Sequence, residues 1–246
     1  MTRRRWIADE VSGNHATLTG DHARHLTQVL RAQVGQEFDI STGKEVRRGR
    51  ISGITADRVE FELGEVVAQS AGTAITVALS IFKFDRMEWA IEKCTELGVE
   101  RIIPVIAGRT EPHLAAAASK RVERWRRIAR QAAEQSRRVS PPDISAPLKF
   151  DHLVAMTVDS RIVLAEAEEK LSLKDAVRQD MGSVLLAFGP EGGWKPQEIA
   201  AFRDGGWISA SLGDTILRTE TAVIAAMAVA ASILGGFERV RPSAVP

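Results

Sequence analysis

Hydrophobic and polar residues follow two different patterns along the chain. In the first 70 residues they alternate over short stretches, such as residues 58–63, with glycines in between. A period of two is typical of strands that bury one face, so this part is predicted to form a small β-barrel or meander. Leu26, Val29 and Leu30 recur at helical spacing and predict one short helix, from His22 to Arg31, packed on the barrel.

From Thr73 onward, predicted strands and helices take turns. The small polar stretch 68–72 precedes this change and marks a boundary, which predicts domains 1–70 and 73–246. The expected strands cover residues 75–82, 101–106, 161–165, 184–188 and 208–212, and the expected helices cover 85–97 and 120–137 and begin after Pro196 and Thr219. Such alternation predicts an α/β domain with a mostly parallel sheet covered by helices.

The helix predicted at 85–97 has a local start signal and one apolar face. Asp85 is suited to be its N-cap, with Glu88 three residues on. The residues of the apolar stripe are Met87, Ile91, Cys94 and Leu97. Cys94 is therefore expected in the core, where an apolar environment makes a thiol unreactive.

The last predicted helix is apolar nearly all round. Thr219 is predicted as its N-cap. The apolar stretch 222–234 is well short of the roughly 20 residues that a bilayer-spanning helix needs. Such a helix must bury both faces, either inside one subunit or against a second, so a homodimer is a reasonable expectation.

Composition is ordinary for a folded protein, with 44% hydrophobic and 26% charged residues. The single cysteine, Cys94, excludes an intrachain disulfide, and one thiol with five scattered histidines excludes a Cys-rich zinc site. We expect no metal. The basic start of the chain is followed by Asp9 and Glu10, so no secretion signal is expected and a reducing cytoplasm is the predicted location.

Positive charge is concentrated in one segment. The net charge is only +1, yet residues 120–138 hold eight basic and two acidic residues. An apolar stripe through Val122 and Trp125 leaves the arginines on a broad outward face. That face is either merely solvated or binds phosphates; the surplus of positive charge with few partners along the helix favours phosphate.

Two loops carry the candidate chemistry, because ligands of parallel sheets bind beyond the carboxyl ends of the strands. The loop 188–196 has three glycines within five positions, which let backbone amides approach a ligand; the alternative is a tight strand-to-helix turn. The loop 212–221 leads into the apolar helix. Its Arg218 either holds the loop through Asp214 or Glu220, or stabilises an anion at the sheet edge.

These motifs together resemble the ribosomal RNA small subunit methyltransferase E family, within the SPOUT superfamily of S-adenosylmethionine enzymes. The matching segments are HARHLTQVLRAQVG (22–35), KFDRMEWAIEKCTELGV (83–99), ERWRRIARQAAEQSRR (123–138), FGPEGGWKPQEI (188–199) and LGDTILRTETA (212–222). Two departures stand out. Lys195 occupies a position where the family usually has a Ser or Thr helix cap, and Arg137 one where it often has Gly.

The resemblance implies an N-terminal PUA-like β-barrel that binds RNA and a C-terminal SPOUT α/β domain with a trefoil knot. It also implies a homodimer. The implied reaction is methylation of uridine N3 in 16S ribosomal RNA of the small subunit, with S-adenosylmethionine as cofactor. The alternatives are a SPOUT enzyme that acts on another RNA or another base atom, and a non-catalytic RNA-binding assembly factor.

The resemblance also implies which residues form the site. The cofactor would contact Leu164, Ala165, Glu166, Phe188, Gly189, Pro190, Glu191, Gly192, Gly193 and the range 212–218, above all Leu212, Gly213, Ile216, Leu217 and Arg218. Arg218 would stabilise charge on the uracil oxygens, while Glu220 would accept the proton or orient Arg218, with Glu191 as a second candidate base. The RNA would contact Arg24, Arg31, Arg126, Arg127, Arg130 and Arg138.

Overall fold

The computed structural model describes residues 5–69, 74–166, 168 and 170–236. Contacts within the chain separate two units, one of residues 1–70 with 133–141 and one of residues 71–132 with 142–246. The predicted boundary at 70–73 lies outside the described residues, so the ranges 1–70 and 73–246 stay a prediction.

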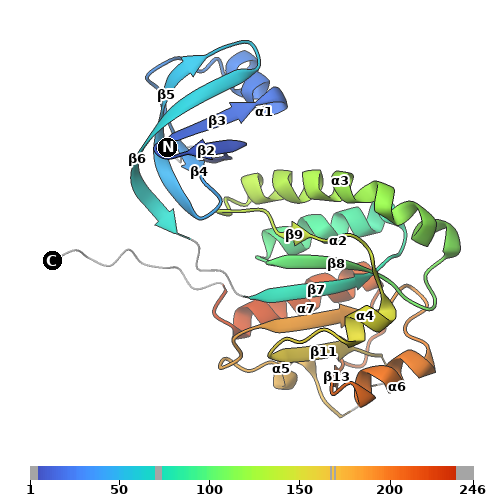
Figure 1. The fold of residues 1–246 in the computed structure, drawn as a ribbon. Coiled ribbons are helices and arrows are strands. Elements are labelled where there is room, and N and C mark those ends of the chain that lie inside the picture. Colours follow the sequence, from blue (N-terminus) through green and yellow to red (C-terminus); the bar gives the residue numbers. More distant parts are fainter. Residues whose placement is uncertain (1–4, 70–73, 167, 169, 237–246) are drawn as a thin grey trace. The chain divides into compact units, whose positions relative to one another are not determined.

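The first unit is a curled six-stranded sheet with a short helical segment, as the alternating pattern predicts (Figure 1). Its strands are β1 (Arg5–Ile7), β2 (Glu10–Ser12), β3 (His15–Thr19), β4 (Glu37–Ser41), β5 (Glu45–Ile54) and β6 (Arg58–Gln69). Their order is β1-β4-β5-β6-β3-β2, antiparallel except for β1 beside β4. Leu18, Ile40 and Phe61 lie in its core.

The helix predicted at 22–31 begins earlier in the sequence, and less of it packs on the sheet. The structure has α1 (Gly20–Arg24) followed by a π-helical turn, η1 (His25–Val29). Leu26 is buried as expected, but Val29 is 65% and Leu30 39% exposed, so the prediction that all three pack on the sheet is wrong. The wider π turn breaks the 3.6-residue repeat on which that prediction depends.

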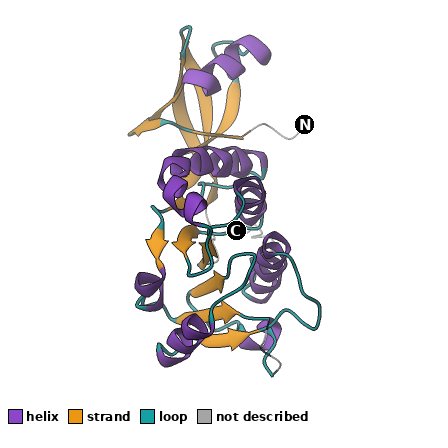
Figure 2. Cartoon of the chain, turned by 90° about the vertical axis from the view of Figure 1, so that its right-hand side faces the viewer, coloured by secondary structure: helices purple, strands orange, loops and turns teal. Residues whose placement is uncertain are grey.

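The second unit is a parallel sheet with helices on both faces, which confirms the predicted α/β class (Figure 2). The strands are β7 (Ile75–Ser80), β8 (Arg101–Ile106), β9 (Asp143–Ile144), β10 (Leu148–Lys149), β11 (Ser160–Leu164), β12 (Val184–Phe188) and β13 (Ile208–Ala210). The order is β10-β8-β7-β12-β11-β13, and β9 also pairs with β8. The trefoil knot that the resemblance implies stays a prediction.

Hydrophobic clusters cover the two faces of this sheet. The helices are α2 (Phe84–Glu96), α3 (Pro112–Gln135), α4 (Phe150–Val154), α5 (Leu173–Ala176), α6 (Pro196–Asp204) and α7 (Thr219–Ile233). Residues of α2, α3, α5 and α7 pack on one face, and residues of α4 and α6 pack on the other. Cys94 is buried in the first cluster, as predicted, and burial raises the pKa of its thiol.

Three helix starts differ from the predictions. The N–H of Met87 donates to the carbonyl of Lys83 at 2.9 Å, so Lys83 and not Asp85 is the N-cap of α2. In the same way, Arg218 and not Thr219 is the N-cap of α7. Helix α3 begins at Pro112, well before Lys120, because the alanines after Leu114 continue the helix.

Helix α7 buries one stripe fully, through residues such as Val223, Ala226 and Met227. Residues on its other side, including Ile224 and Ala228, are half-buried, so burial on both faces is not completed within this chain. No helix in the described part of the chain combines the length and apolar character that crossing a bilayer requires.

Candidate active site

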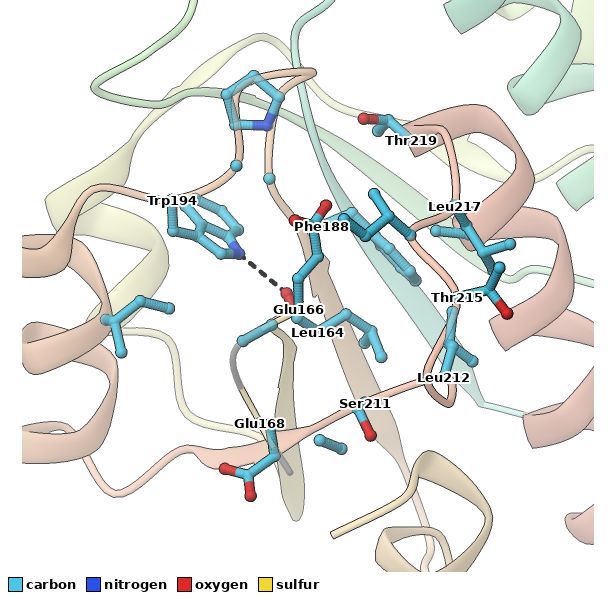
Figure 3. Close-up of a pocket in the computed structure, with 18 of the residues that line it drawn as sticks. Leu164, Glu166, Glu168, Phe188, Trp194, Ser211, Leu212, Thr215, Leu217 and Thr219 are labelled. Atoms are coloured by element: carbon cyan, nitrogen blue, oxygen red, sulfur yellow. Dashed lines mark hydrogen bonds between the residues drawn. The ribbon is translucent and has the colours of Figure 1, made fainter. Parts of the chain in front are cut away.

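A cavity of about 660 Å³ lies at the carboxyl ends of β11, β12 and β13, where the sequence predicts a ligand. Its lining includes the predicted residues Leu164, Ala165, Glu166, Phe188, Gly189, Pro190, Gly192, Gly193, Leu212, Gly213, Ile216 and Leu217. Figure 3 shows Trp194 on one side of the cavity and Leu212, Thr215 and Leu217 on the opposite side. The two motif loops therefore come together, as expected.

The glycine loop, residues 188–196, is held by polar contacts to its neighbours. The indole Nε1 of Trp194 donates to the carbonyl of Leu164 at 3.2 Å and ties the loop to the end of β11 (Figure 3). Within the loop, the N–H of Gly193 donates to the carbonyl of Pro190 at 2.7 Å. Contacts within the protein therefore fix the shape of this wall of the cavity.

Glu198, in the first turn of α6, fixes the base of the same loop. Its Oε2 accepts from the N–H of Lys195 at 2.8 Å, and its Oε1 accepts from the N–H of Gly108 at 2.7 Å. The residue is only 6% exposed. Glu198 thus supplies the half of a capping box in which the N3 carboxylate accepts from the N–H of the N-cap residue, and it links two loops that are distant in sequence.

Arg109, next to Gly108, also stabilises the glycine loop. Its guanidinium donates to the carbonyl of Gly192, and the side chain lines the cavity. Sequence reasoning missed Arg109, and also these other lining residues: Glu168, Trp194, Ile199, Ala210, Ser211, Thr219 and Ala222. Of these residues, only Trp194 could have been predicted, because it directly follows the glycines of the loop.

The opposite wall, residues 211–218, is much more open. Ser211 anchors it, because its N–H donates to Leu171 and its carbonyl accepts from Leu173. Gly213 has a φ of +106°, a conformation that side-chain-bearing residues rarely adopt. Ile216 is 80% exposed although it lines the cavity. An apolar surface is thus left uncovered where a ligand would lie.

The predicted catalytic residues lie outside this cavity. Arg218 and Glu220 line a second hollow of about 380 Å³ together with residues from the start of α2. Glu191, predicted to contact the cofactor, is likewise not among the residues that line the large cavity. Arg218 is exposed at the N-cap of α7, whereas Glu220 is buried.

Arg86 lies between the two candidate bases. Its Nη1 is 3.5 Å from Oε1 of Glu220 and 3.6 Å from Oε1 of Glu191. Among the described residues, Oε2 of Glu220 is buried without a hydrogen-bond partner. Sequence reasoning missed Arg86, since nothing along the chain shows that two distant loops supply its partners.

The predicted RNA-contacting arginines divide by environment. On α3, Arg126 and Arg127 are exposed and Arg130 is half-buried, and Arg126 also donates to the carbonyl of Ile144 at 2.8–3.0 Å. A neighbouring arginine of the same helix, Arg124, forms a two-pronged bond with Glu88 at 2.6 and 2.8 Å. The positive face is thus partly neutralised by groups from other elements.

The other three predicted contacts belong to the first unit. Arg24 is exposed and bonds to Asp21, and Arg31 is exposed with a φ of +51°. Arg138 is half-buried just after Arg137, which has a φ of +60°. This left-handed backbone explains why a glycine suits position 137.

The cavity suits S-adenosylmethionine in size and chemistry. Leu212, Ile216 and Leu217 offer an apolar wall for a planar adenine. Glu166 and Glu168 bring negative charge to a ligand that carries positive charge, and the N–H of Lys170 donates to Glu168 at 2.9 Å, which holds the pKa of that carboxyl below its ordinary value. The residues present therefore fit the group.

Comparisons with known proteins point the same way. Residues 69–231 match the family described as RNA methyltransferase domain, and residues 18–64 match the RNA methyltransferase PUA domain. A Bacillus subtilis protein named ribosomal RNA small subunit methyltransferase E is 31% identical over 86% of this chain and 87% of its own length. One from Synechocystis is 32% identical over 86% of this chain and 71% of its own.

Two solved structures share the fold along nearly the whole chain. A ribosomal RNA small subunit methyltransferase E from Neisseria gonorrhoeae, bound to S-adenosyl methionine, has a TM-score of 0.82 at 29% identity and covers 94% of this chain and 98% of that one. A methyltransferase from Legionella pneumophila, also with bound cofactor, has a TM-score of 0.83 at 27% identity, with the same coverage. By these matches, the chain belongs to the ribosomal RNA small subunit methyltransferase E family.

Proposed function

We propose that this protein methylates N3 of a uridine in 16S ribosomal RNA of the small subunit, with S-adenosylmethionine as the methyl donor. The observation that carries the proposal is the cavity between the two motif loops, in a family whose solved relatives bind this cofactor. The names of the relatives supply the small-subunit ribosomal RNA. The uridine N3 position comes from the family resemblance.

The cofactor cavity contributes mainly orientation. When bound, S-adenosylmethionine supplies a methyl carbon on a positive sulfur, which keeps the electron pair of the broken bond. The glycine loop and the apolar side chains of Leu212 and Leu217 would hold the donor and limit its orientations. Positioning of this kind is worth up to roughly 7–11 kcal/mol in favourable cases.

The residues at the start of α7 stabilise the negative charge that develops on the uracil. Uracil N3 must lose its proton as its lone pair bonds to the methyl carbon. Arg218, exposed at the N-cap of α7, stabilises the negative charge that develops on the uracil oxygens. The proton acceptor is one of the two carboxylates beside Arg86, Glu191 or Glu220.

Mass spectrometry of 16S RNA incubated with the enzyme and labelled cofactor tests the reaction. The expected product is labelled N3-methyluridine from the wild-type protein and none from Arg218→Ala, which still binds the cofactor in calorimetry. Glu191→Gln and Glu220→Gln separate the two candidate bases, because only loss of the true base removes the fall of the rate at low pH from the pH–rate profile. Label on another base atom or RNA would replace the substrate assignment, and absence of cofactor binding would indicate a non-catalytic RNA-binding factor.

The proposed RNA-binding surface includes Arg127, an exposed arginine on α3. Arg127→Ala should weaken RNA binding and reduce the slope of log K against log salt by about 0.7–0.9, the release of one counterion. Arg124→Ala is the matched control, since Glu88 already neutralises Arg124. Filter binding at several salt concentrations measures both slopes; equal slopes for Arg127→Ala and wild type would show that this face is only solvated.

The proposal extends to a cytoplasmic homodimer with a PUA-like RNA-binding domain in residues 1–70 and a knotted SPOUT methyltransferase domain in residues 73–246. The half-buried outer side of α7 and the exposed Trp89, which is 46% accessible, support a second copy against this face. Analytical ultracentrifugation should give twice the chain mass of 26.8 kDa. A monomer at micromolar concentration would refute the dimer.

A further inference from the structure

Arg86 connects the glycine loop with the start of α7. Its guanidinium lies within 3.6 Å of a carboxylate on each, Glu191 in the loop and Glu220 in the helix. We propose that Arg86 is a positioning residue for methyl transfer, which keeps the catalytic end of α7 in register with the cofactor cavity. This inference rests on the proposed function, since it assigns a role in that reaction.

Burial makes Glu220 depend on Arg86. The side chain of Glu220 is 9% exposed, and its Oε2 has no hydrogen-bond partner among the described residues. A carboxylate taken out of water needs a compensating charge. Arg86 is the cation that the structure records within 4.0 Å of it in the described part of the chain. Glu220 therefore takes its position from Arg86.

A guanidinium suits this task better than an ammonium. Both ion pairs are made by one nitrogen, Nη1, whose two N–H groups keep fixed directions in the guanidinium plane, whereas the N–H groups of an ammonium rotate freely. Arg86 projects from the first turn of α2, a helix that buries Met87 and Ile91 and packs beside α7 (Figure 1). The guanidinium is thus carried by a helix with a buried face that packs beside α7.

The cofactor cavity does not depend on this contact. The glycine loop has three other supports, the bond of Trp194 to Leu164, the bond of Arg109 to Gly192, and Glu198 at its base. Losing Arg86 should therefore leave the shape of that wall intact. The loss should act on the step in which Glu220 and Arg218 meet the uracil.

Steady-state kinetics and calorimetry of Arg86→Gln and Arg86→Lys test the proposal. Arg86→Gln should lower kcat at least 100-fold while the Kd for S-adenosylmethionine changes less than threefold. Arg86→Lys should restore part of the rate, because it returns the charge without the fixed N–H directions of the guanidinium. The matched control is Lys93→Gln on the same helix, whose ammonium pairs with Glu92 and Glu96 at 2.8 Å and should keep the wild-type kcat.

A kcat within threefold of wild type in Arg86→Gln would overturn the proposal. So would a loss of cofactor affinity as large as the loss of rate, since Arg86 would then only shape the cavity. If Arg86→Gln does not fold, Arg86→Lys alone tests the proposal. It should then show a kcat about tenfold lower than wild type at an unchanged Kd, and a wild-type kcat would refute the proposal. Failure of the proposed function looks different, because the wild-type protein itself then transfers no methyl group to 16S RNA.

Discussion

The two walls of the cavity are built in opposite ways. The glycine loop is fixed by its own Trp194, which bonds to Leu164, by the buried Glu198 in the helix that follows, and by Arg109 from a distant loop. The facing loop, residues 211–218, is anchored at Ser211, and its tip from Gly213 to Ile216 is exposed.

This difference separates two tasks of one binding site. A wall that keeps its shape without the ligand spends no binding energy on ordering itself and can orient the reacting atoms. An exposed wall with an uncovered apolar side chain can close on the ligand and bury new surface. We therefore expect changes in the glycine loop to affect both stability and cofactor binding, and changes to the exposed side chains of the facing loop to affect mainly affinity.

The largest effect should come from removing the anchor of the fixed wall. Glu198→Gln places an amide NH₂ where the carboxylate now accepts from the N–H of Lys195 or Gly108. A buried donor left without an acceptor costs about 1–3 kcal/mol, and more where a charged group is lost. Urea denaturation should show a loss of about 2–3 kcal/mol together with at least tenfold weaker cofactor binding.

Asp204→Asn is the control for that change. Asp204 lies at the end of the same helix with its side chain 78% exposed, so stability should stay within about 0.5 kcal/mol. If Glu198→Gln were as stable as this control, the base of the glycine loop would not be the rigid anchor.

The sequence predicts those parts of the site whose interactions join residues close together in the chain. Strands β8 and β12 match the predicted residues 101–106 and 184–188, because strands buried on both faces appear as continuous apolar runs. The cavity loops were predicted because each motif carries its own glycines next to a strand end. Both signals are local.

Three of the groups that were not predicted act between parts of the chain that are distant in sequence. Arg109 and Arg86 bind partners more than 80 residues away, and Glu198 joins Lys195 to Gly108. Local rules also misplaced Thr219 as a cap, because the first hydrogen bond of α7 starts from the carbonyl of Arg218 instead. Only the folded chain brings these groups together.

Substituting one glycine in each wall should weaken cofactor binding by an intermediate amount and compares the two walls directly. In Gly189→Ala the new Cβ would lie 3.2 Å from the backbone of Gly193, so the fixed loop must shift. In Gly213→Ala the Cβ meets nothing within 4 Å, and the cost is the strain of a positive φ, about 1–3 kcal/mol, which an open loop can partly relax. Calorimetry should show about tenfold weaker cofactor binding for Gly189→Ala and a smaller loss for Gly213→Ala. The reverse order would mean that the facing loop is the rigid wall.

The smallest effect should come from the exposed tip, and it should appear in binding but not in stability. Ile216 is 80% exposed, so Ile216→Ala should change the free energy of unfolding by less than about 0.5 kcal/mol. If the side chain becomes covered when the ligand binds, the lost contact costs about 1 kcal/mol, or roughly a fivefold higher Kd for S-adenosylmethionine. Val34→Ala, at a position 62% exposed in the first unit, should change neither quantity. An unchanged Kd in Ile216→Ala would mean that this wall stays open around the cofactor, and closure would then have to come from another part of the protein.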